Sequence, residues 1–313
     1  MSAICIENLV KTYGAVRALD GLSLEVEQGS IFGFLGPNGA GKTTTIRILT
    51  GLAHPSSGHA SVAGVEIGHN GALARRIGYL PEEPAFYGWM KAQEFLEYIG
   101  QLFGLSAVAR RKRAEELLEK VGLWDVRKRR IRGFSRGMRQ RLGIAQALVN
   151  QPEVLFLDEP ASALDPAGRR DVLELIAGLR GQCTVFMSTH ILADVERVCD
   201  TVGIIHKGRM LRVARQEELT TAYALPVFRV DVAGNGNQPL AAWAEKIGQE
   251  AMVEQVQVDG NAIRIRVRDV ENARGWLLHA LADSGLAVER FEAVKPSLEE
   301  VFLNLVNNEE VRQ

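Results

Sequence analysis

Apolar and polar residues alternate along the first part of the chain, a pattern typical of strands with one buried face. Segments 3–9 and 22–26 show this alternation, and the short polar stretch between them predicts an antiparallel, hairpin-like pair. Segment 31–35 is instead continuously apolar, as a parallel strand buried on both faces would be. Further apolar segments follow at 60–67, 77–80, 154–157, 184–187 and 202–206, and from 77–80 onward they are read as strands.

Helical spacing of apolar residues separates these strands, and residues 91–150 are mainly helical. Helices are predicted over 44–52, over 107–121 after a capping Ser106, from Ser135 to Asn150, and from Asp165-Pro166 onward. Strands that alternate with helices predict an α/β fold with a parallel sheet. The sequence thus predicts such a core with an antiparallel subdomain before it and a helical subdomain, about 91–150, inserted in it.

Composition changes near residue 220, and a second pattern begins. Strand, helix, strand, strand, helix and strand are predicted at 228–232, 239–248, 252–258, 262–268, 270–284 and 286–294. This order is that of a ferredoxin-like α+β domain, and Asp259-Gly260 supplies a hairpin turn in its middle. We therefore predict two domains, 1–220 and 221–313, and a last helix from Ser297.

The net charge of the chain is −1, with 37 Lys and Arg against 38 Asp and Glu. No global field therefore attracts the chain to nucleic acid or to anionic lipid. Cys5, Cys183 and Cys199 show no metal-binding or redox spacing, and we interpret them as reduced core thiols of a cytosolic protein. We find no signal peptide and no apolar run long enough to span a bilayer, so any membrane part would come from another chain.

A glycine-rich segment directly follows the buried strand at 31–35. It fits the phosphate-loop pattern G-x-x-x-x-G-K-[ST] with Gly36, Pro37, Asn38, Gly39, Ala40, Gly41, Lys42 and Thr43. Such a loop directs backbone N–H groups and a helix N-terminus at phosphate oxygens. Lys42 would add a full charge, and the Thr43 hydroxyl could ligate Mg²⁺. The alternative, a glycine-rich turn that happens to carry Lys-Thr, does not explain the order of strand, loop and helix.

Two carboxylates end the apolar strand at 154–157. Asp158 is placed to ligate Mg²⁺, directly or through water, and Glu159 to polarise the attacking water as a general base. His190 follows the strand at 184–187 and could sense a γ-phosphate. The simpler interpretations are a strand that runs into a polar turn and a structural histidine.

Over residues 1–215 this ordered set resembles the nucleotide-binding subunit of an ATP-binding cassette (ABC) transporter. Residues 36–43 match the Walker A motif and 154–159 the Walker B motif. Tyr13 matches the aromatic residue that stacks on adenine, His190 the switch histidine, and 162–165 the loop that communicates across the dimer. The resemblance implies ATP and Mg²⁺ as cofactors and ATP hydrolysis as the reaction.

The most discriminating match is the segment 134–141, which stands where the family has its Leu-Ser-Gly-Gly-Gln signature. The resemblance implies that Ser135 and Gly137 present a helix N-terminus to the γ-phosphate of ATP held by a second protomer. Two cassettes facing head to tail would complete two sites by two-fold symmetry. A solvated basic run is the plain alternative for these residues.

Two departures from the family pattern stand out. Arg136 and Met138 replace the usual Gly and Gln of the signature, so the contact that Arg136 makes stays open. Glu82 stands where the family normally has Gln, and its carboxylate can still ligate Mg²⁺. Both departures, and the end of the tail at 297–302, resemble a subset of bacterial export cassettes.

The resemblance assigns a role to each residue of the predicted site. Nucleotide contacts are implied for Tyr13, Gly36, Pro37, Asn38, Gly39, Ala40, Gly41, Lys42, Thr43, Thr44 and, from the other protomer, Ser135 and Gly137. Thr43, Asp158 and Glu82 are the implied metal ligands, and Glu159 and His190 the catalytic pair. The implied protein is an exporter ATPase, a homodimer or cassette heterodimer, cytoplasmic and peripheral on the inner face of the cell membrane, with integral membrane permease subunits and no nucleic acid as partners.

The sequence leaves two interpretations of the surface that would meet the permease. Phe86, Tyr87, Trp89 and Phe95 suit either a groove for a permease helix or ordinary core, and the basic run 127–132 suits a solvated face. A cassette ATPase acting on ribosomes or DNA would need a second cassette or a long coiled coil, and a GTPase would need an Asn-Lys-x-Asp motif, neither of which we find. The tail could bind a small regulatory ligand or stiffen the dimer.

Overall fold

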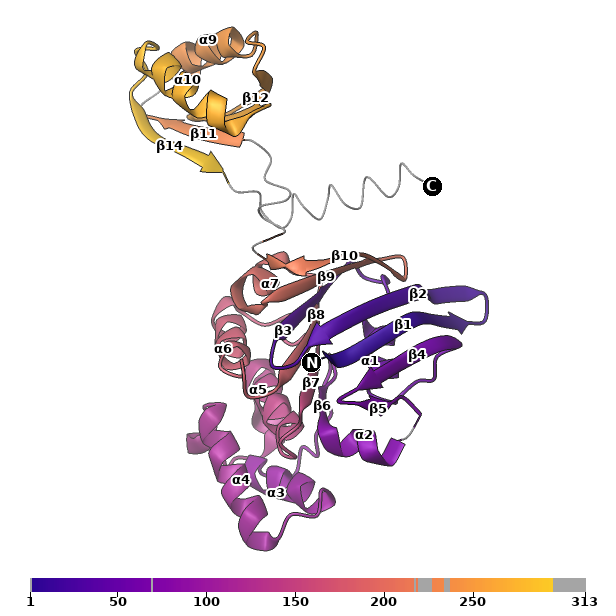
Figure 1. The fold of residues 1–313 in the computed structure, drawn as a ribbon. Helices are drawn as coiled ribbons and strands as arrows, with labels where there is room; N and C mark the ends of the chain where they lie inside the picture. The colour runs from indigo at the N-terminus through magenta and orange to yellow at the C-terminus, as the bar shows by residue number, and fades with distance from the viewer. Residues whose placement is uncertain (1, 69, 217, 219–226, 234–236, 295–313) are drawn as a thin grey trace. The chain divides into compact units, whose positions relative to one another are not determined.

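The computed structural model describes residues 2–68, 70–216, 218, 227–233 and 237–294. The chain divides into two compact units between residues 216 and 217. Figure 1 shows the elements of both units, and each unit is described separately below.

An antiparallel sheet begins the first unit. Its strands are β1 (Ser2–Tyr13), β2 (Val16–Glu27), β4 (Ser57–Val62) and β5 (Val65–Glu66), in the order β2-β1-β4-β5. The predicted hairpin is therefore present, with strands that run longer than the apolar alternation indicates. The apolar segment 60–67 holds the end of β4, a tight turn and β5, because Ala63 adopts a left-handed φ of 51°.

A mainly parallel sheet of six strands forms the centre of this unit. Its order is β10-β9-β3-β8-β7-β6, with β3 (Ile31–Leu35), β6 (Ile77–Leu80), β7 (Val154–Asp158), β8 (Thr184–Thr189), β9 (Thr201–His206) and β10 (Arg209–Arg215). Strands β3, β7 and β8 are buried at every position, which explains their continuous apolar sequence. In this sheet only β10, at the edge, runs antiparallel. The sequence pattern did not predict this strand, because three arginines interrupt its apolar residues.

Helices cover both faces of the central sheet (Figure 1). The α-helices of the first unit are α1 (Lys42–Leu49), α2 (Asn70–Arg76), α3 (Ala92–Leu102), α4 (Ala107–Lys120), α5 (Arg136–Ala147), α6 (Pro166–Ala177) and α7 (Leu192–Val198). Helices α3, α4 and α5 pack together as the helical subdomain. Ser106 and Ser135 cap α4 and α5, as predicted, and α5 ends earlier than the predicted Asn150.

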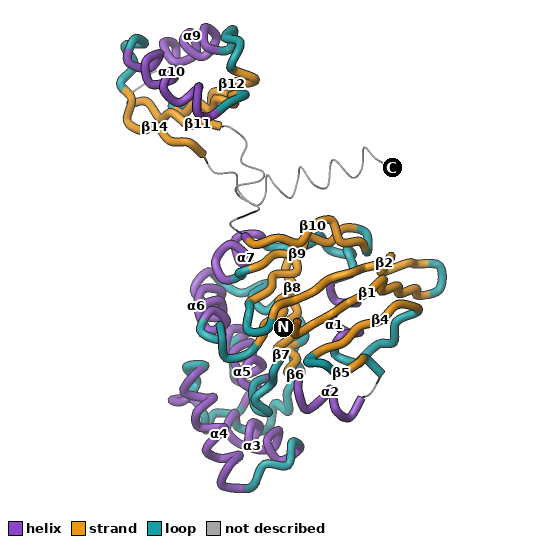
Figure 2. Tube along the Cα trace, in the orientation of Figure 1, coloured by secondary structure: helices purple, strands orange, loops and turns teal. Residues whose placement is uncertain are grey.

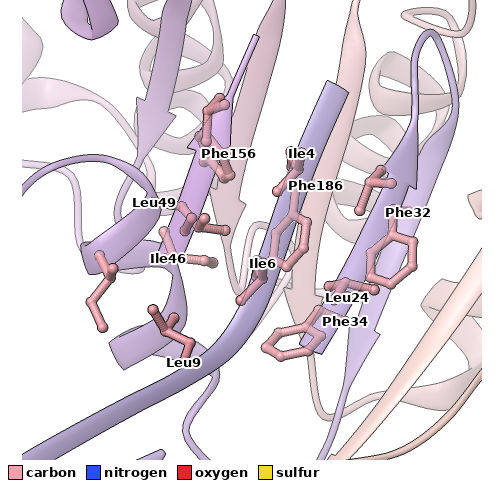
Figure 3. Packing of buried hydrophobic residues seen from close by; sticks show 14 of the residues in the cluster. Ile4, Ile6, Leu9, Leu24, Phe32, Phe34, Ile46, Leu49, Phe156 and Phe186 are labelled. Atoms are coloured by element: carbon pink, nitrogen blue, oxygen red, sulfur yellow. The ribbon is translucent and has the colours of Figure 1, made fainter. Parts of the chain in front are cut away.

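A cluster of phenylalanines joins the two sheets of this unit. Phe32 of β3 and Phe156 of β7 are in register with Phe186 of β8, and ring centroids lie 5.3 and 5.7 Å apart. Figure 3 shows these rings facing Ile4 and Ile6 of β1, with α1 beside them. Burial of this cluster fixes the sheet that carries the site residues at its carboxyl edge.

The second unit is a four-stranded antiparallel sheet with two helices (Figure 2). Its elements are β11 (Val227–Val232), α9 (Asn237–Ile247), β12 (Val253–Asp259), β13 (Ala262–Val267), α10 (Val270–Ala282) and β14 (Val288–Val294). The strand order β12-β13-β11-β14 and the alternation of strands and helices confirm the predicted ferredoxin-like topology. The last predicted helix, from Ser297, lies outside the described residues.

Candidate active site

The phosphate-loop sequence forms the connection between β3 and α1, and α1 begins at Lys42. Gly41 has a φ of 110°, a conformation that residues with a side chain rarely adopt. A Cβ atom there would lie 2.8 Å from the carbonyl oxygen of Ala18 on β2. The loop therefore needs glycine here for both its curvature and its close contact with β2.

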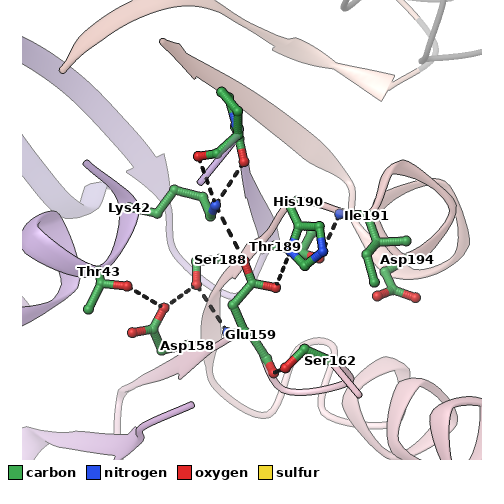
Figure 4. A network of polar contacts seen from close by, with 12 residues as sticks. Lys42, Thr43, Asp158, Glu159, Ser162, Ser188, Thr189, His190, Ile191 and Asp194 are labelled. Atoms are coloured by element: carbon green, nitrogen blue, oxygen red, sulfur yellow. Dashed lines mark hydrogen bonds and ion pairs between the residues drawn. The ribbon is translucent and has the colours of Figure 1, made fainter. Parts of the chain in front are cut away.

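Lys42 is buried in the centre of the site, with its side chain only 6% exposed. Its ammonium group donates to the carbonyl oxygens of Gly36, at 2.7 Å, and Pro37, at 3.3 Å. It also lies 3.3 Å from Oε1 of Glu159, as Figure 4 shows. The structure thus brings the predicted phosphate-binding cation and the predicted general base into direct contact.

Asp158 ends β7 and lies between two hydroxyl groups. Its Oδ1 accepts hydrogen bonds from Ser188, at 2.6 Å, and from Thr43, at 3.3 Å. Burial raises the pKa of the Asp158 carboxyl, and the two hydroxyl donors oppose that rise. Ser188 was not among the predicted site residues, although its place two residues before His190 at the end of a core strand could have suggested it.

Glu159 takes a left-handed backbone conformation, with a φ of 48°. Its backbone N–H donates to Oγ of Ser188 at 3.1 Å, and its Oε2 lies 2.9 Å from Nδ1 of His190. The Ser162 hydroxyl donates to the Glu159 carbonyl at 3.0 Å. Contacts to its backbone and to its carboxylate hold the Glu159 side chain in one orientation. Strained backbone of this kind is concentrated at functional sites.

A cavity of about 210 Å³ lies over this group of residues. It is lined by Ala18, Asn38, Gly39, Gly41, Lys42, Thr43, Thr44, Glu82, Glu159 and His190. The structure therefore joins the loop, Glu82, Glu159 and His190, which lie far apart in the sequence. Ala18 also lines the cavity and was not predicted, because a small residue within an ordinary strand carries no signal of a site.

Seven of the residues implied by the resemblance do not line this cavity, namely Tyr13, Gly36, Pro37, Ala40, Ser135, Gly137 and Asp158. Tyr13 ends β1 and is 47% exposed, with the Lys11 ammonium 4.7 Å from its ring centroid. Ser135 caps α5 by accepting from the N–H of Met138 at 3.2 Å, and Gly137 lies in the first turn of the same helix. The N-terminus of α5 therefore belongs to a different part of the surface from the cavity of the same chain.

Oxygen donors near the cavity suit Mg²⁺, which binds one or two carboxylates together with phosphate oxygens and water. Asp158 and Thr43 present adjacent oxygens, and Glu82 lines the cavity. Among the described residues, no three His, Cys, Asp or Glu side chains cluster as a metal site of their own. The donor set fits a metal held mainly by a bound phosphate.

Comparison with known proteins identifies the family. Residues 19–162 match the ABC transporter family, and residues 216–306 match the C-terminal domain of DrrA1-3-like ATP-binding proteins. The ABC transporter ATP-binding protein YxlF of Bacillus subtilis is 40% identical over 97% of this chain and 99% of its own length. This chain belongs to the ABC transporter ATP-binding proteins.

Two further similarities agree with this family. The daunorubicin resistance ATP-binding protein DrrA3 of Streptomyces coeruleorubidus is 35% identical over 98% of this chain and 97% of its own length. A solved ATP-binding cassette, a dimer in a post-hydrolysis state bound to ADP and Pi, matches with a TM-score of 0.62 and 26% identity over 68% of this chain and 98% of that chain.

The family establishes the activity: the chain is an ATP-binding subunit of an ABC transporter and hydrolyses ATP. Within the part of the chain that the structure describes, no helix is both long and apolar enough to cross a membrane.

Proposed function

We propose that this chain powers export through separate membrane permease subunits, as a head-to-tail dimer with two composite ATP sites. The observation that carries the dimer is the incomplete cavity. Its walls supply a phosphate-binding loop and a carboxylate with its histidine, yet the signature helix N-terminus at Ser135 does not line it. The relative captured as a dimer with ADP and Pi supports the same assembly.

Within each site, Lys42 and the loop N–H groups would hold the β- and γ-phosphates. Asp158, Thr43 and Glu82 would hold Mg²⁺, which supplies charge neutralisation for the phosphates. Glu159 would accept a proton from the attacking water, an action worth about 10²–10⁴-fold in rate. His190, 2.9 Å from the Glu159 carboxylate, would keep it directed at that water.

The partner protomer would complete the site with the N-terminus of its α5. Ser135 occupies only the Met138 N–H of the first turn, so other N–H groups, including that of Gly137, remain for a phosphate. The partial positive charge of the helix end favours that contact. Stabilisation of the dimer by ATP follows from this division of the site between two chains.

A permease would dock on the aromatic and basic surface of the helical subdomain. Tyr87 and Trp89 are 50% and 69% exposed, whereas Phe95 is 2% exposed and belongs to the core. The backbone of Arg132 donates to Gly88 at 3.0 Å, which places the basic run beside these rings. Large exposed aromatics beside cations are typical of binding surfaces.

Export as the direction rests on similarity to DrrA3, a resistance protein, and on the DrrA1-3-like C-terminal domain. The chain would then act at the inner face of the cell membrane as a peripheral, cytoplasmic subunit. We propose a homodimer, because one chain carries both halves of the composite site. We also propose that the second unit is a separate domain from about residue 221.

One variant tests the dimer and the general base together. Glu159→Gln should lose ATP hydrolysis, keep ATP binding, and form a dimer with ATP that size-exclusion chromatography with light scattering detects. Affinity purification of this variant from membranes with ATP should recover the permease. Wild-type turnover in the variant would refute the base assignment, and a monomer at saturating ATP would refute the composite site.

A further inference from the structure

The hairpin between β9 and β10 lies directly against the phosphate loop. The N–H of Gly208, in this hairpin, donates to the carbonyl oxygen of Ala40 at 2.9 Å. The carbonyl oxygen of Gly208 accepts from the N–H of Asp20 on β2, also at 2.9 Å. One residue therefore connects the loop to β2 through its own backbone.

The backbone around Gly208 is too closely packed to admit a side chain. Gly208 has a φ of 78°, and a Cβ atom there would lie 2.7 Å from the carbonyl oxygen of Ala18. Ala18 itself lines the nucleotide cavity, and its carbonyl also faces Gly41 of the loop. Since backbone packs against backbone on both sides, a displacement of the hairpin would displace the loop.

Side chains outside the cavity also hold the hairpin against β2. Arg209 Nε donates to Oδ2 of Asp20 at 2.7 Å, and Arg17 Nη2 lies 2.6 Å from Oδ1. The hydrogen bond from Arg209 is the main reason why the pKa of the Asp20 carboxyl is lowered. The Asp20 side chain is only 19% exposed.

We propose that Asp20 and Arg209 are positioning residues for ATP binding, which act through Gly208 on the phosphate loop. Neither side chain lines the cavity, and each is engaged by the other at 2.7 Å. Their pairing keeps the Ala40 carbonyl in a fixed position. The neighbouring N–H groups of the loop then point in the directions that phosphate binding requires. Binding constellations of this kind depend on supporting residues to within about 0.5 Å. The inference rests on the phosphate-binding role of the loop.

Steady-state ATPase kinetics of the full chain test the pair. Asp20→Asn and Arg209→Gln should each raise KM for ATP about fivefold, with kcat within about twofold of wild type, because the pair is partly exposed and acts on binding alone. Arg209→Lys keeps the charge and should recover most of the affinity. The double variant should be no worse than either single variant, as expected for two residues that act through one contact.

Glu27→Gln is the matched control. Glu27 pairs with Arg215 at 3.8 Å across the same two strands, β2 and β10, but at the end remote from the hairpin. It should leave KM unchanged. Thermal unfolding of every variant shows whether the fold is intact, and Lys42→Ala serves as a reference for direct loss of phosphate binding.

Three outcomes would overturn the proposal: an unchanged KM in Asp20→Asn and Arg209→Gln, an equal rise in KM for Glu27→Gln, or a fall in kcat and melting temperature without a change in KM. The last would make the pair a general stabilising contact. If Lys42→Ala also left KM unchanged, the assignment of the loop itself would be wrong, and that result is separate from a failure of the pair.

Discussion

Lys42 and Glu159 form a buried ion pair in which Nζ lies 3.3 Å from Oε1, and both side chains are less than a tenth exposed. The ammonium that would bind phosphate is therefore partly neutralised by the carboxylate that would activate water. A triphosphate has to compete with Glu159 for the same cation. This competition gives the carboxylate an influence on binding as well as on chemistry.

Glu159→Gln should therefore bind ATP more tightly than wild type, in addition to losing hydrolysis. A neutral amide competes weakly for the Lys42 ammonium, so we expect an affinity several-fold higher, in the range of about 1 kcal/mol for one charged hydrogen bond. Isothermal titration calorimetry with ATP at short incubation times measures it. Equal or weaker affinity would show that the ion pair does not oppose binding.

Lys42→Ala should weaken ATP binding roughly 10- to 100-fold, the range expected for a lost hydrogen bond to a charged group. It also leaves Glu159 buried without its cation, so the melting temperature should fall. Lys112→Ala is a control, because the Lys112 side chain is 78% exposed on α4 and pairs with Glu116, outside the cavity. An unchanged ATP affinity in Lys42→Ala would show that Lys42 does not bind phosphate.

Arg136→Ala should weaken the ATP-dependent dimer and make its formation less sensitive to salt. Arg136 is exposed at the first position of α5, where its positive charge opposes the helix dipole in the isolated chain. We expect that charge to meet the phosphates of the partner's ATP. Dimer dissociation constants measured in the Glu159→Gln background at two salt concentrations, with Arg111→Ala as control, test this. Equal constants would leave Arg136 a surface residue.

Reversing the charge at Arg130 and Arg132 should abolish copurification with the permease and leave ATP hydrolysis by the isolated chain intact. Both side chains are exposed, and the backbone of this segment pairs with residues 88 and 91 beside Trp89. Arg111 and Lys112 of α4, 71% and 78% exposed, provide a charge-matched double variant that should keep the partner. Retention of the permease by the first variant would place its docking surface elsewhere.

Asp194 should make the stability of the first unit depend on pH. Burial raises the pKa of its carboxyl above the ordinary 3.8, although Arg169 lies 2.6 Å away. A raised folded pKa means that its stabilising contribution is full below 3.8 and is lost as pH rises through the folded pKa. An Asn side chain at position 194 does not titrate in this pH range, so Asp194→Asn removes this dependence on pH.

The free energy of unfolding of Asp194→Asn, minus that of wild type, should therefore grow from about pH 4 to about pH 7. Urea denaturation across this range measures the difference. A pH-independent difference, or one that shrinks toward neutral pH, would contradict the burial argument. Glu174→Gln, an exposed partner of Arg197, should show no such trend.

Much of the site could be predicted because its residues stand at strand ends. Lys42, Asp158 and His190 each follow a continuously apolar strand, and parallel strands place their carboxyl ends at one edge of a sheet. Ala18 could not be predicted, since nothing in a small residue within a strand signals a partner, whereas the place of Ser188 near the end of a core strand was a signal that we did not use. Strand β10 was missed because its three exposed arginines interrupt the apolar pattern, and polar residues cost little on an edge strand.

The elements, the phosphate loop, the ferredoxin-like order of the tail and the family resemblance follow from the sequence alone, because they depend on local spacing and residue type. Which charges meet depends on the tertiary structure. Three such contacts join residues up to 189 positions apart in the sequence. They are the ion pair of Lys42 with Glu159, the hydrogen bonds of two hydroxyl groups to Asp158, and the pairing of Asp20 with Arg209. Such pairs arise from the packing of strands against one another, which no local pattern along the chain records.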